Sequence, residues 1–286
     1  MEKYEYCETL IKESSDSFYR AFSQLEPDKA NAVYAIYAFC RTADDAIDEH
    51  NDLEKINELK NKVKATFEGD VPKDLLFEAL HDTIQKFPSP IDPYLDLLDG
   101  MRDDYYNKPI ETEEQFDQYC YKVAGTVGLM LLPVLASETL KTNKAKKLKD
   151  VAVELGKGMQ ITNILRDARE DFMKDRVYFP TDVIDQHQLQ IEITRTGLVT
   201  AEWRGMMEYF IEKAREKYQY FYDNADLFDK DAIEATFIAA KFYESIMDKI
   251  QKKDYTNINK RHSVGKLKKF FLVRGAHKEL KQRGLI

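Results

Sequence analysis

The sequence is poor in the residues that make tight turns. Its 286 residues include only 11 glycines and 8 prolines. A sandwich or barrel of many short strands needs more turns than these residues supply. No segment alternates apolar and polar residues for long enough to predict a strand. The shortage of turn residues therefore favours an all-α protein.

Cysteine pairs and long apolar runs are missing as well. The three cysteines, Cys7, Cys40 and Cys120, lie far apart, so the sequence predicts neither a disulfide framework nor a zinc site. The longest apolar runs, 32–40 and 127–136, fall short of the roughly 20 residues that span a bilayer. The charged N-terminus lacks the apolar core of a signal peptide. We therefore expect a cytoplasmic protein with reduced thiols.

What the sequence does contain is helical periodicity along most of its length. Pro27 and Pro72 stand where helices are expected to begin, and the Phe-Pro-Ser-Pro stretch at 87–90 separates two more. No low-complexity linker or repeat divides the chain, so we expect one all-α domain over residues 1–286. The predicted helices span residues 3–15, 28–49, 52–67, 73–86, 92–107, 113–140, 144–172, 199–223, 230–252 and 265–282.

Charge is distributed unevenly along the chain. The net charge is −8, but residues 249–286 hold 12 Lys or Arg against 2 Asp or Glu, a balance of +10, which leaves −18 for residues 1–248. The basic segment is either a solvated terminal helix or a segment that meets phosphate on a substrate, a membrane surface or a nucleic acid. No nucleic-acid-binding motif accompanies the charge, so we expect no nucleic-acid partner.

Two predicted helices place carboxylates on a face that is otherwise apolar. With successive residues about 100° apart, Arg41, Asp44 and Asp48 fall within about 40° of Tyr37 and continue an inward stripe that includes Val33. Carboxylates in such a position need compensation, because burying an unpaired charge is very costly. This helix therefore predicts a site that binds cations.

The predicted helix over 144–172 repeats the pattern. Asn163, Asp167 and Asp171 share an arc of about 80° with Gln160, beside an apolar stripe that anchors the helix. Arg166 points elsewhere on this helix, which favours an ion pair for it rather than direct contact with a metal. A single D-x-x-x-D is usually a solvated helix face. Two inward copies instead predict a magnesium site, because Mg²⁺ prefers carboxylate and phosphate oxygens.

The residues around these carboxylates resemble two aspartate-rich motifs of the squalene and phytoene synthases. The first motif is matched by residues 37–48, YAFCRTADDAID, and the second by residues 160–171, QITNILRDARED. Between them, residues 119–128, YCYKVAGTVG, are similar to the central motif of the family. Residues 15–22 resemble its N-terminal loop, and residues 175–180 resemble the turn that follows the second motif. The resemblance covers nearly the whole chain, in the order of the family.

This resemblance implies a single-domain helical bundle of the isoprenoid synthase type around a central hydrophobic cavity, with the two aspartate motifs facing each other near its mouth. It also implies a head-to-head condensation of two prenyl diphosphates. Two to three magnesium ions would draw off one diphosphate, and the double bond of the second substrate would attack the allylic cation. The resulting cyclopropylcarbinyl diphosphate would then ionise and rearrange to a hydrocarbon.

Roles for individual residues follow from the same resemblance. It implies that the metals are held by Asp44, Asp48, Asn163, Asp167 and Asp171. It implies substrate contacts, largely with diphosphate, by Ser15, Arg41, Gln160, Asn163, Arg166, Arg261 and Lys268. Catalytic roles would fall to Tyr37, Arg41, Tyr121, Arg166 and Tyr243. Prenyl contacts would be made by Phe18, Phe22, Val123 and Gly125. Aromatic faces stabilise carbocations, but core packing explains the aromatic residues equally well.

The expected substrate is farnesyl diphosphate and the expected product is dehydrosqualene. The bulky residues Phe22 and Tyr34 would shorten a cavity for a prenyl chain, which favours fifteen carbons over twenty. No dinucleotide-binding fingerprint is present, so no NADPH is expected. A squalene synthase that uses NADPH and a phytoene synthase remain alternatives.

Other classes of protein compete with this interpretation. A di-iron bundle needs two Glu-x-x-His pairs, and the sequence offers one, at Glu78 and His81, outside both carboxylate helices. A non-catalytic relative that binds or assembles other molecules would not need both aspartate pairs. The basic segment at 249–286 adds the hypothesis of peripheral docking on an anionic membrane. The sequence does not predict an oligomeric state.

Overall fold

The computed structural model describes residues 2–286, and all regular structure in that span is helical. The first half contains α1 (Glu2–Ser14), α2 (Asp16–Phe22), α3 (Pro27–Asp48), α4 (Leu53–Glu68), α5 (Leu75–Lys86), α6 (Asp92–Tyr105), α7 (Glu113–Cys120), the π-helix η1 (Tyr121–Gly125) and α8 (Thr126–Leu135). The second half contains α9 (Ala145–Met173), α10 (Thr181–Gln186), α11 (Ile191–Arg195), α12 (Ala201–Asp223), α13 (Ile233–Lys252) and α14 (Lys266–Gln282). Short 3₁₀ turns lie at Thr139–Lys141, Ala225–Leu227 and Thr256–Ile258.

A proline and several side-chain caps mark where helices begin. Pro27 occupies the first turn of α3, where its missing N–H removes no helical hydrogen bond. Asp52 accepts a hydrogen bond from the Lys55 amide at the start of α4, and Thr112 forms a capping box with Gln115 at the start of α7. These caps satisfy amide groups that the first helical turn leaves without partners.

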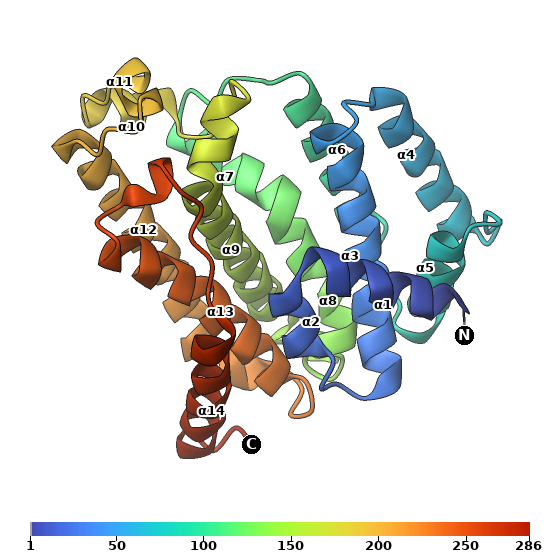
Figure 1. The fold of residues 1–286 in the computed structure, drawn as a ribbon. Coiled ribbons are helices and arrows are strands. Elements are labelled where there is room, and N and C mark those ends of the chain that lie inside the picture. Colours follow the sequence, from blue (N-terminus) through green and yellow to red (C-terminus); the bar gives the residue numbers. More distant parts are fainter. Residues whose placement is uncertain (1) are drawn as a thin grey trace.

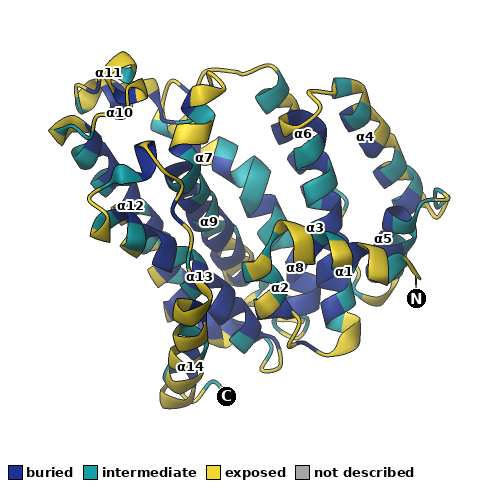
Figure 2. Ribbon diagram, viewed as in Figure 1, coloured by how far each residue is buried: buried dark blue, intermediate teal, exposed yellow. Residues whose placement is uncertain are grey.

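The long helix α9 runs through the middle of the molecule (Figure 1). It packs against α12 and α13 on one side and against η1 and α8 on the other. Helix α3 packs against α1, α4, α5, α6 and α8. Buried residues follow the inward faces of these helices, and exposed residues gather on α14 and on the outer turns (Figure 2). No helix within residues 2–286 is long and apolar enough to cross a membrane.

Two glycines allow α9 to approach the η1–α8 segment closely. A Cβ atom at Gly156 would lie 2.3 Å from the Ala124 carbonyl oxygen, and one at Gly128 would lie 2.3 Å from the Ala152 carbonyl oxygen. Backbone atoms on both sides leave no room for a larger residue. The approach brings α9 directly against the helices of the central motif.

Most predicted helices are confirmed to within a few residues, and three regions differ. The helix predicted over 113–140 is divided by η1, because the Thr126 amide donates to the Tyr121 carbonyl, one residue beyond the α-helical partner. The N-terminal loop expected over 15–22 is a helix, α2, capped by Ser15. The short helices α10 and α11 were not predicted.

Candidate active site

The two aspartate helices face one cavity of about 550 Å³. Its wall is built by residues of α2, α3, α6, the α7–η1–α8 segment, α9 and α13, and by Arg261 from the segment before α14. The predicted site residues that line it are Ser15, Phe18, Phe22, Tyr37, Arg41, Asp44, Asp48, Val123, Gln160, Asn163, Arg166, Asp167, Asp171, Tyr243 and Arg261. The fold therefore brings together residues that are more than 200 positions apart.

Arginines pair with the carboxylates of both helices. On α3, the Arg41 Nη1 atom lies 3.2 Å from Asp44 Oδ2, and its Nη2 atom also pairs with Asp45. On α9, Arg166 donates to Asp167 from Nε at 2.8 Å, as expected for an ion-pair partner. Arg261 Nε lies 2.9 Å from the same carboxylate, which ties the basic segment to the mouth of the cavity.

Burial and mutual repulsion disfavour ionisation of several of these carboxyl groups. Burial raises the pKa of Asp44 to about 6, with a further contribution from the nearby Asp48. Burial likewise raises the pKa of Asp171 to about 7, with repulsion from Asp167 and Asp48. Burial and repulsion by neighbouring carboxylates together outweigh the arginines, which act to lower these pKa values.

The donor set fits magnesium ions. The cavity wall holds seven acidic residues (44, 48, 49, 104, 167, 170 and 171) and four basic residues (41, 166, 174 and 261), so acidic residues outnumber basic ones by three. Within residues 2–286, no three His, Cys, Asp or Glu side chains converge closely enough to hold a single ion. The Asn163 amide nitrogen donates to Gln160 Oε1 at 3.2 Å, and its buried Oδ1 atom accepts no hydrogen bond. A free neutral oxygen beside excess carboxylate is what a hard cation needs.

Behind the carboxylates the cavity is aromatic and then aliphatic. The Phe18 ring lies 5.5 Å from the Phe22 ring, 6.0 Å from Tyr37 and 5.4 Å from Tyr243, the last in an edge-on arrangement. The deeper wall comes largely from aliphatic residues of α8 and α9, such as Leu131 and Leu155. The site therefore joins a charged region to an apolar one.

Four sequence-based expectations need correction. Tyr121 does not line the cavity, because its hydroxyl donates to Asp96 at 3.1 Å on the other side of η1. Gly125 packs against α9 near Val153 rather than lining the cavity. Lys268 lies outside as well, where its Nζ atom donates to the Ser245 carbonyl at 3.3 Å. Tyr34 is buried against Tyr19, and only Phe22 of the predicted bulky pair reaches the cavity.

The structure adds residues that sequence reasoning left out of the site. Asp104 of α6 lines the cavity and accepts a hydrogen bond from Tyr119 at 3.3 Å. Burial and the nearby Asp48 raise its pKa to about 8. Arg176, within the turn that resembles the family motif, forms an ion pair with Asp48 across 128 positions of sequence. Helical periodicity is a local pattern and does not reveal such a long-range pair. The resemblance to the family identified the turn at residues 175–180, but not the contact that Arg176 makes.

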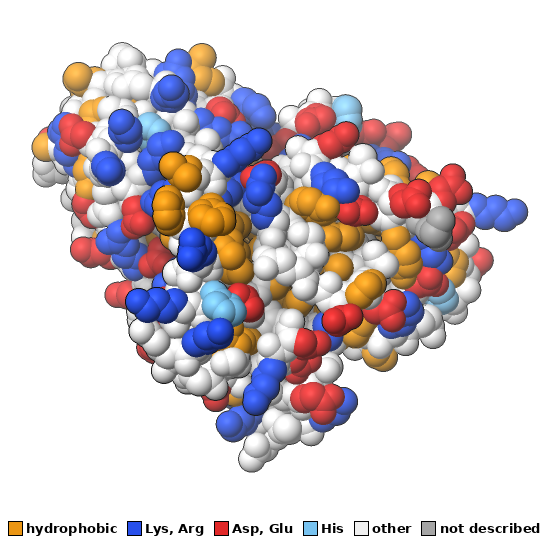
Figure 3. All heavy atoms as spheres, turned by 60° about the horizontal axis from the view of Figure 1, so that its bottom comes forward, with side chains coloured by type: hydrophobic (Ala, Val, Ile, Leu, Met, Phe, Trp, Pro, Cys, Tyr) orange, Lys and Arg blue, Asp and Glu red, His pale blue; other side chains and the backbone are white. Residues whose placement is uncertain are grey.

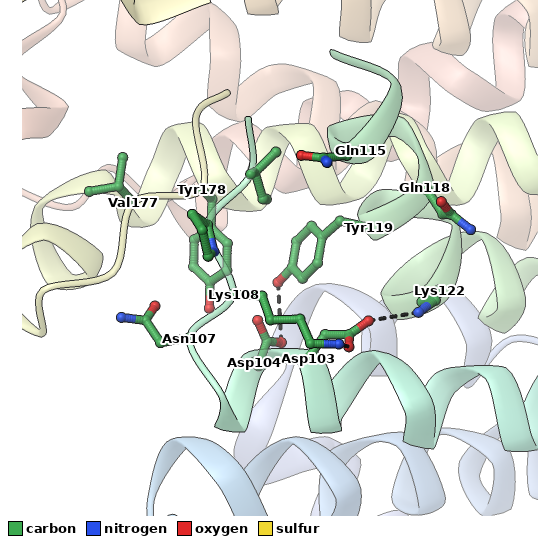
Figure 4. A pocket seen from close by; sticks show the side chains of 12 residues that line it. Asp103, Asp104, Asn107, Lys108, Gln115, Gln118, Tyr119, Lys122, Val177 and Tyr178 are labelled. Atoms are coloured by element: carbon green, nitrogen blue, oxygen red, sulfur yellow. Dashed lines mark hydrogen bonds and ion pairs between the residues drawn. The ribbon is translucent and has the colours of Figure 1, made fainter. Parts of the chain in front are cut away.

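A smaller pocket of about 240 Å³ shares a wall with the cavity. The wall consists of Asp104 and the stacked rings of Tyr119 and Tyr178, whose centroids are 5.1 Å apart (Figure 4). On the far side, Asp103 pairs with Lys108 and Lys122. Asp103 therefore has a structural role, while Asp104 faces the cavity.

Comparison with known proteins places this site in a family. The sequence profile described as squalene/phytoene synthase matches residues 11–268, and the chain belongs to the squalene/phytoene synthase family. The 4,4'-diapophytoene synthase of Staphylococcus haemolyticus is 32% identical over 98% of this chain and 98% of its own. A crystal structure of a dehydrosqualene synthase with bound ligand has a TM-score of 0.92 at 34% identity, covering 98% of this chain and 97% of that one. The predicted isoprenoid synthase fold is thereby confirmed.

Plant proteins are similar to the chain over a smaller share of their length. The chloroplastic phytoene synthase of Narcissus pseudonarcissus is 33% identical over 93% of this chain. This chain spans 64% of that relative.

Proposed function

We propose that this protein condenses two molecules of farnesyl diphosphate head to head to dehydrosqualene, without NADPH. The observation that carries the proposal is the cavity itself. Carboxylates of α3 and α9 converge on the mouth of an apolar chamber, beside arginines that suit diphosphate. The similarity to a diapophytoene synthase and to a dehydrosqualene synthase structure supports this substrate and product.

Magnesium is the proposed cofactor. Asp44, Asp48, Asn163, Asp167 and Asp171 would hold it, and bound ions would neutralise the charge of the departing diphosphate. The surplus of acidic over basic residues on the cavity wall supports two to three divalent ions together with bound diphosphate. Arg41, Arg166 and Arg261 would donate to diphosphate oxygens once the ions have taken over the carboxylates that they now pair with.

The rest of the cavity would guide the carbon chemistry. In the first step, one C–O bond breaks, diphosphate departs, and the double bond of the second substrate forms a cyclopropane ring with loss of one proton. In the second step, the other diphosphate and a second proton depart and the skeleton rearranges to dehydrosqualene. The faces of Phe18, Tyr37 and Tyr243 would stabilise the cations, and the apolar wall would exclude water from them.

The test is to incubate the purified protein with magnesium and farnesyl diphosphate, with and without NADPH, and to identify the extracted hydrocarbon by mass. Dehydrosqualene in both reactions is expected. Squalene that forms only with NADPH would contradict the proposal. Asp44→Asn and Asp167→Asn should abolish turnover, whereas Asp150→Asn, an exposed carboxylate on α9, should leave it unchanged. If the Asp44→Asn and Asp167→Asn proteins both functioned like the wild type, the function would not depend on these carboxylates. The protein would then be a non-catalytic relative of the family.

Phytoene synthesis is the second candidate, because several plant phytoene synthases are about as similar to the chain as the bacterial relative is. The same assay with geranylgeranyl diphosphate separates the two. A forty-carbon product together with none from farnesyl diphosphate would establish this alternative.

A further inference from the structure

Helix α14 exposes three large apolar side chains within two turns. Leu267, Phe270 and Phe271 are 72%, 55% and 61% exposed. Soluble proteins rarely leave such side chains together in water without a binding partner. This surface, the α14 apolar patch, comes forward in Figure 3, where hydrophobic side chains gather beside lysine and arginine side chains.

Basic residues continue the same face of α14. With about 100° between successive residues, the outward face lies within about 60° of Leu267. It comprises Leu267, Phe270, Phe271, Arg274, Lys278, Lys281 and the uncharged Gln282. The opposite face is buried through Ala276 and Leu280. The outward face is therefore apolar in its first half and cationic in its second half.

The cations on this face lack acidic partners. Within residues 2–286, no Asp or Glu forms an ion pair with Arg274, Lys278 or Lys281. Neighbouring charges of α14 are paired, such as Arg283 with Glu279 and Lys269 with Asp16. A second copy of the same face would bring like charges together, which opposes self-association there. An anionic surface that also accepts apolar groups satisfies both halves of the face.

We propose that α14 docks the protein on an anionic lipid membrane. Leu267, Phe270 and Phe271 enter the boundary between headgroups and acyl chains, while Arg274, Lys278 and Lys281 contact anionic headgroups. The basic half also strengthens the interaction through the long apolar stems of its lysines.

The docked orientation would place α14 between the lipid and two helices of the cavity wall. Lys269 of α14 donates to Asp16 of α2 at 2.8 Å, and Lys268 donates to the Ser245 carbonyl of α13 at 3.3 Å. Helices α2 and α13 line the cavity through Phe18 and Tyr243. Transfer of an insoluble hydrocarbon product to the bilayer would follow from this orientation and rests on the proposed function. The docking itself does not.

The test is co-sedimentation of the full chain with vesicles, without substrate or magnesium. Vesicles of phosphatidylcholine with about one third phosphatidylglycerol should bind the protein at low salt, and vesicles of phosphatidylcholine alone should bind it weakly. The double variant Lys278→Ala, Lys281→Ala should reduce the vesicle partition coefficient about 25-fold, because each basic residue near an anionic surface contributes about fivefold. High salt should remove that difference. Phe270→Ser with Phe271→Ser should weaken binding at every salt concentration.

Matched variants on other faces serve as controls. Lys64→Ala with Lys73→Ala removes two exposed, unpaired lysines on and beyond α4, with the same change in net charge. Leu198→Ser removes a side chain that is 58% exposed near α11, at the other end of the molecule (Figure 1). No vesicle binding by the wild type, or equal losses in the controls, would overturn the proposal. So would a change in oligomeric mass of the α14 variants with unchanged vesicle binding, which would assign the face to self-association.

Discussion

Asp48 is the residue at which the negative charges of three helices meet. Its carboxylate lies near Asp44 of α3, Asp104 of α6 and Asp171 of α9, and it contributes to the raised pKa of each. Arg176 reaches this point from the turn after α9. Arg176 and Arg41 do not neutralise four carboxyl groups, so the site without cations is held together against its own charge.

The cluster predicts an unusual pH dependence for the protein without divalent cations. An unfolded aspartate has a pKa near 3.9, whereas Asp44, Asp171 and Asp104 reach about 6, 7 and 8 in the folded chain. Between about pH 4 and about pH 8 the folded protein holds protons that the unfolded chain has lost, so these groups lower stability as pH rises. Thermal unfolding in chelator should show this decline.

Two variants separate the effect of this cluster on the pH dependence of unfolding from the effect of other titrating groups. Asp171→Asn should flatten the decline of the unfolding temperature with pH, because it removes one of the protonated groups. Asp150→Asn, on the same helix but exposed, should leave the slope unchanged. Identical slopes for the wild type and Asp171→Asn would refute the role of the cluster.

Phe22 is the residue that we expect to limit the length of the prenyl chain. Its side chain is 2% exposed, lines the cavity and packs against Phe18. Phe22→Ala should increase turnover of geranylgeranyl diphosphate relative to farnesyl diphosphate by at least about tenfold, since small changes in apolar pockets discriminate by that order. Product masses in competition assays measure the ratio. Phe77→Ala, which empties a buried position away from the cavity, should not change it.

Much of the site was predictable from residues because helices impose a local rule. Asp44 and Asp48, and likewise Asp167 and Asp171, share a helix face at a spacing of four, so the sequence alone shows that they point the same way. Tyr121 and Lys268 show the limit of this rule. A π-helical turn changes the register after Cys120, and the packing of α14 keeps its lysines out of the cavity wall.

At the scale of elements, the contact between α9 and the η1–α8 segment is the most demanding in the structure. Gly156→Ala would place a Cβ atom 2.3 Å from the Ala124 carbonyl oxygen, and neither backbone can withdraw without moving a helix. We expect the free energy of unfolding to fall by about 2–3 kcal/mol, the upper range for overpacking. Denaturant unfolding measures this loss.

The control is a helical glycine with free space around it. Gly275 lies in α14, and a Cβ atom there would meet nothing within 4 Å. Gly275→Ala should raise the free energy of unfolding by about 0.5–1 kcal/mol, because alanine has the higher helix propensity. A Gly156→Ala protein as stable as the wild type would show that α9 can shift.

The division between elements was harder to predict than their existence. Periodicity identified α3 and α9 almost to the residue, because long buried helices repeat their pattern over many turns. Periodicity predicted one continuous helix across η1, because a single wide turn barely disturbs the spacing of apolar residues. The short helices α10 and α11 carry too few turns to show any period.

For the whole molecule, the site joins two halves of the chain that sequence separates. Residues of α3 and α9 line the same mouth, so any ligand that bridges them stabilises the assembled bundle. Magnesium and inorganic diphosphate together should raise the unfolding temperature. At a ligand concentration one hundred times the dissociation constant, binding should raise the free energy of unfolding by about 2.7 kcal/mol. Calorimetry with each component alone and with both measures the effect.

Loss of the carboxylates of one helix should weaken the stabilisation that magnesium and diphosphate give together. Asp167→Asn should bind magnesium and diphosphate together more weakly, so the combined shift in unfolding temperature should shrink. Asp150→Asn should retain the full shift. If diphosphate alone stabilised the protein as much as the pair, the arginines would be the binding groups and magnesium would have no part in it.

The π-helical turn at Tyr121–Gly125 also says something about how this cavity wall tolerates change. Such a turn is an α-helix with one residue too many, and the surplus residue is accommodated locally rather than passed along the chain. Deleting one residue there would restore regular α-helical hydrogen bonding, and the helix on each side of the turn would keep its present orientation. The α8 side chains that line the chamber, such as Leu131 and Leu135, would therefore still face it. This wall can lose one residue at the turn without any exchange of the side chains that a ligand meets.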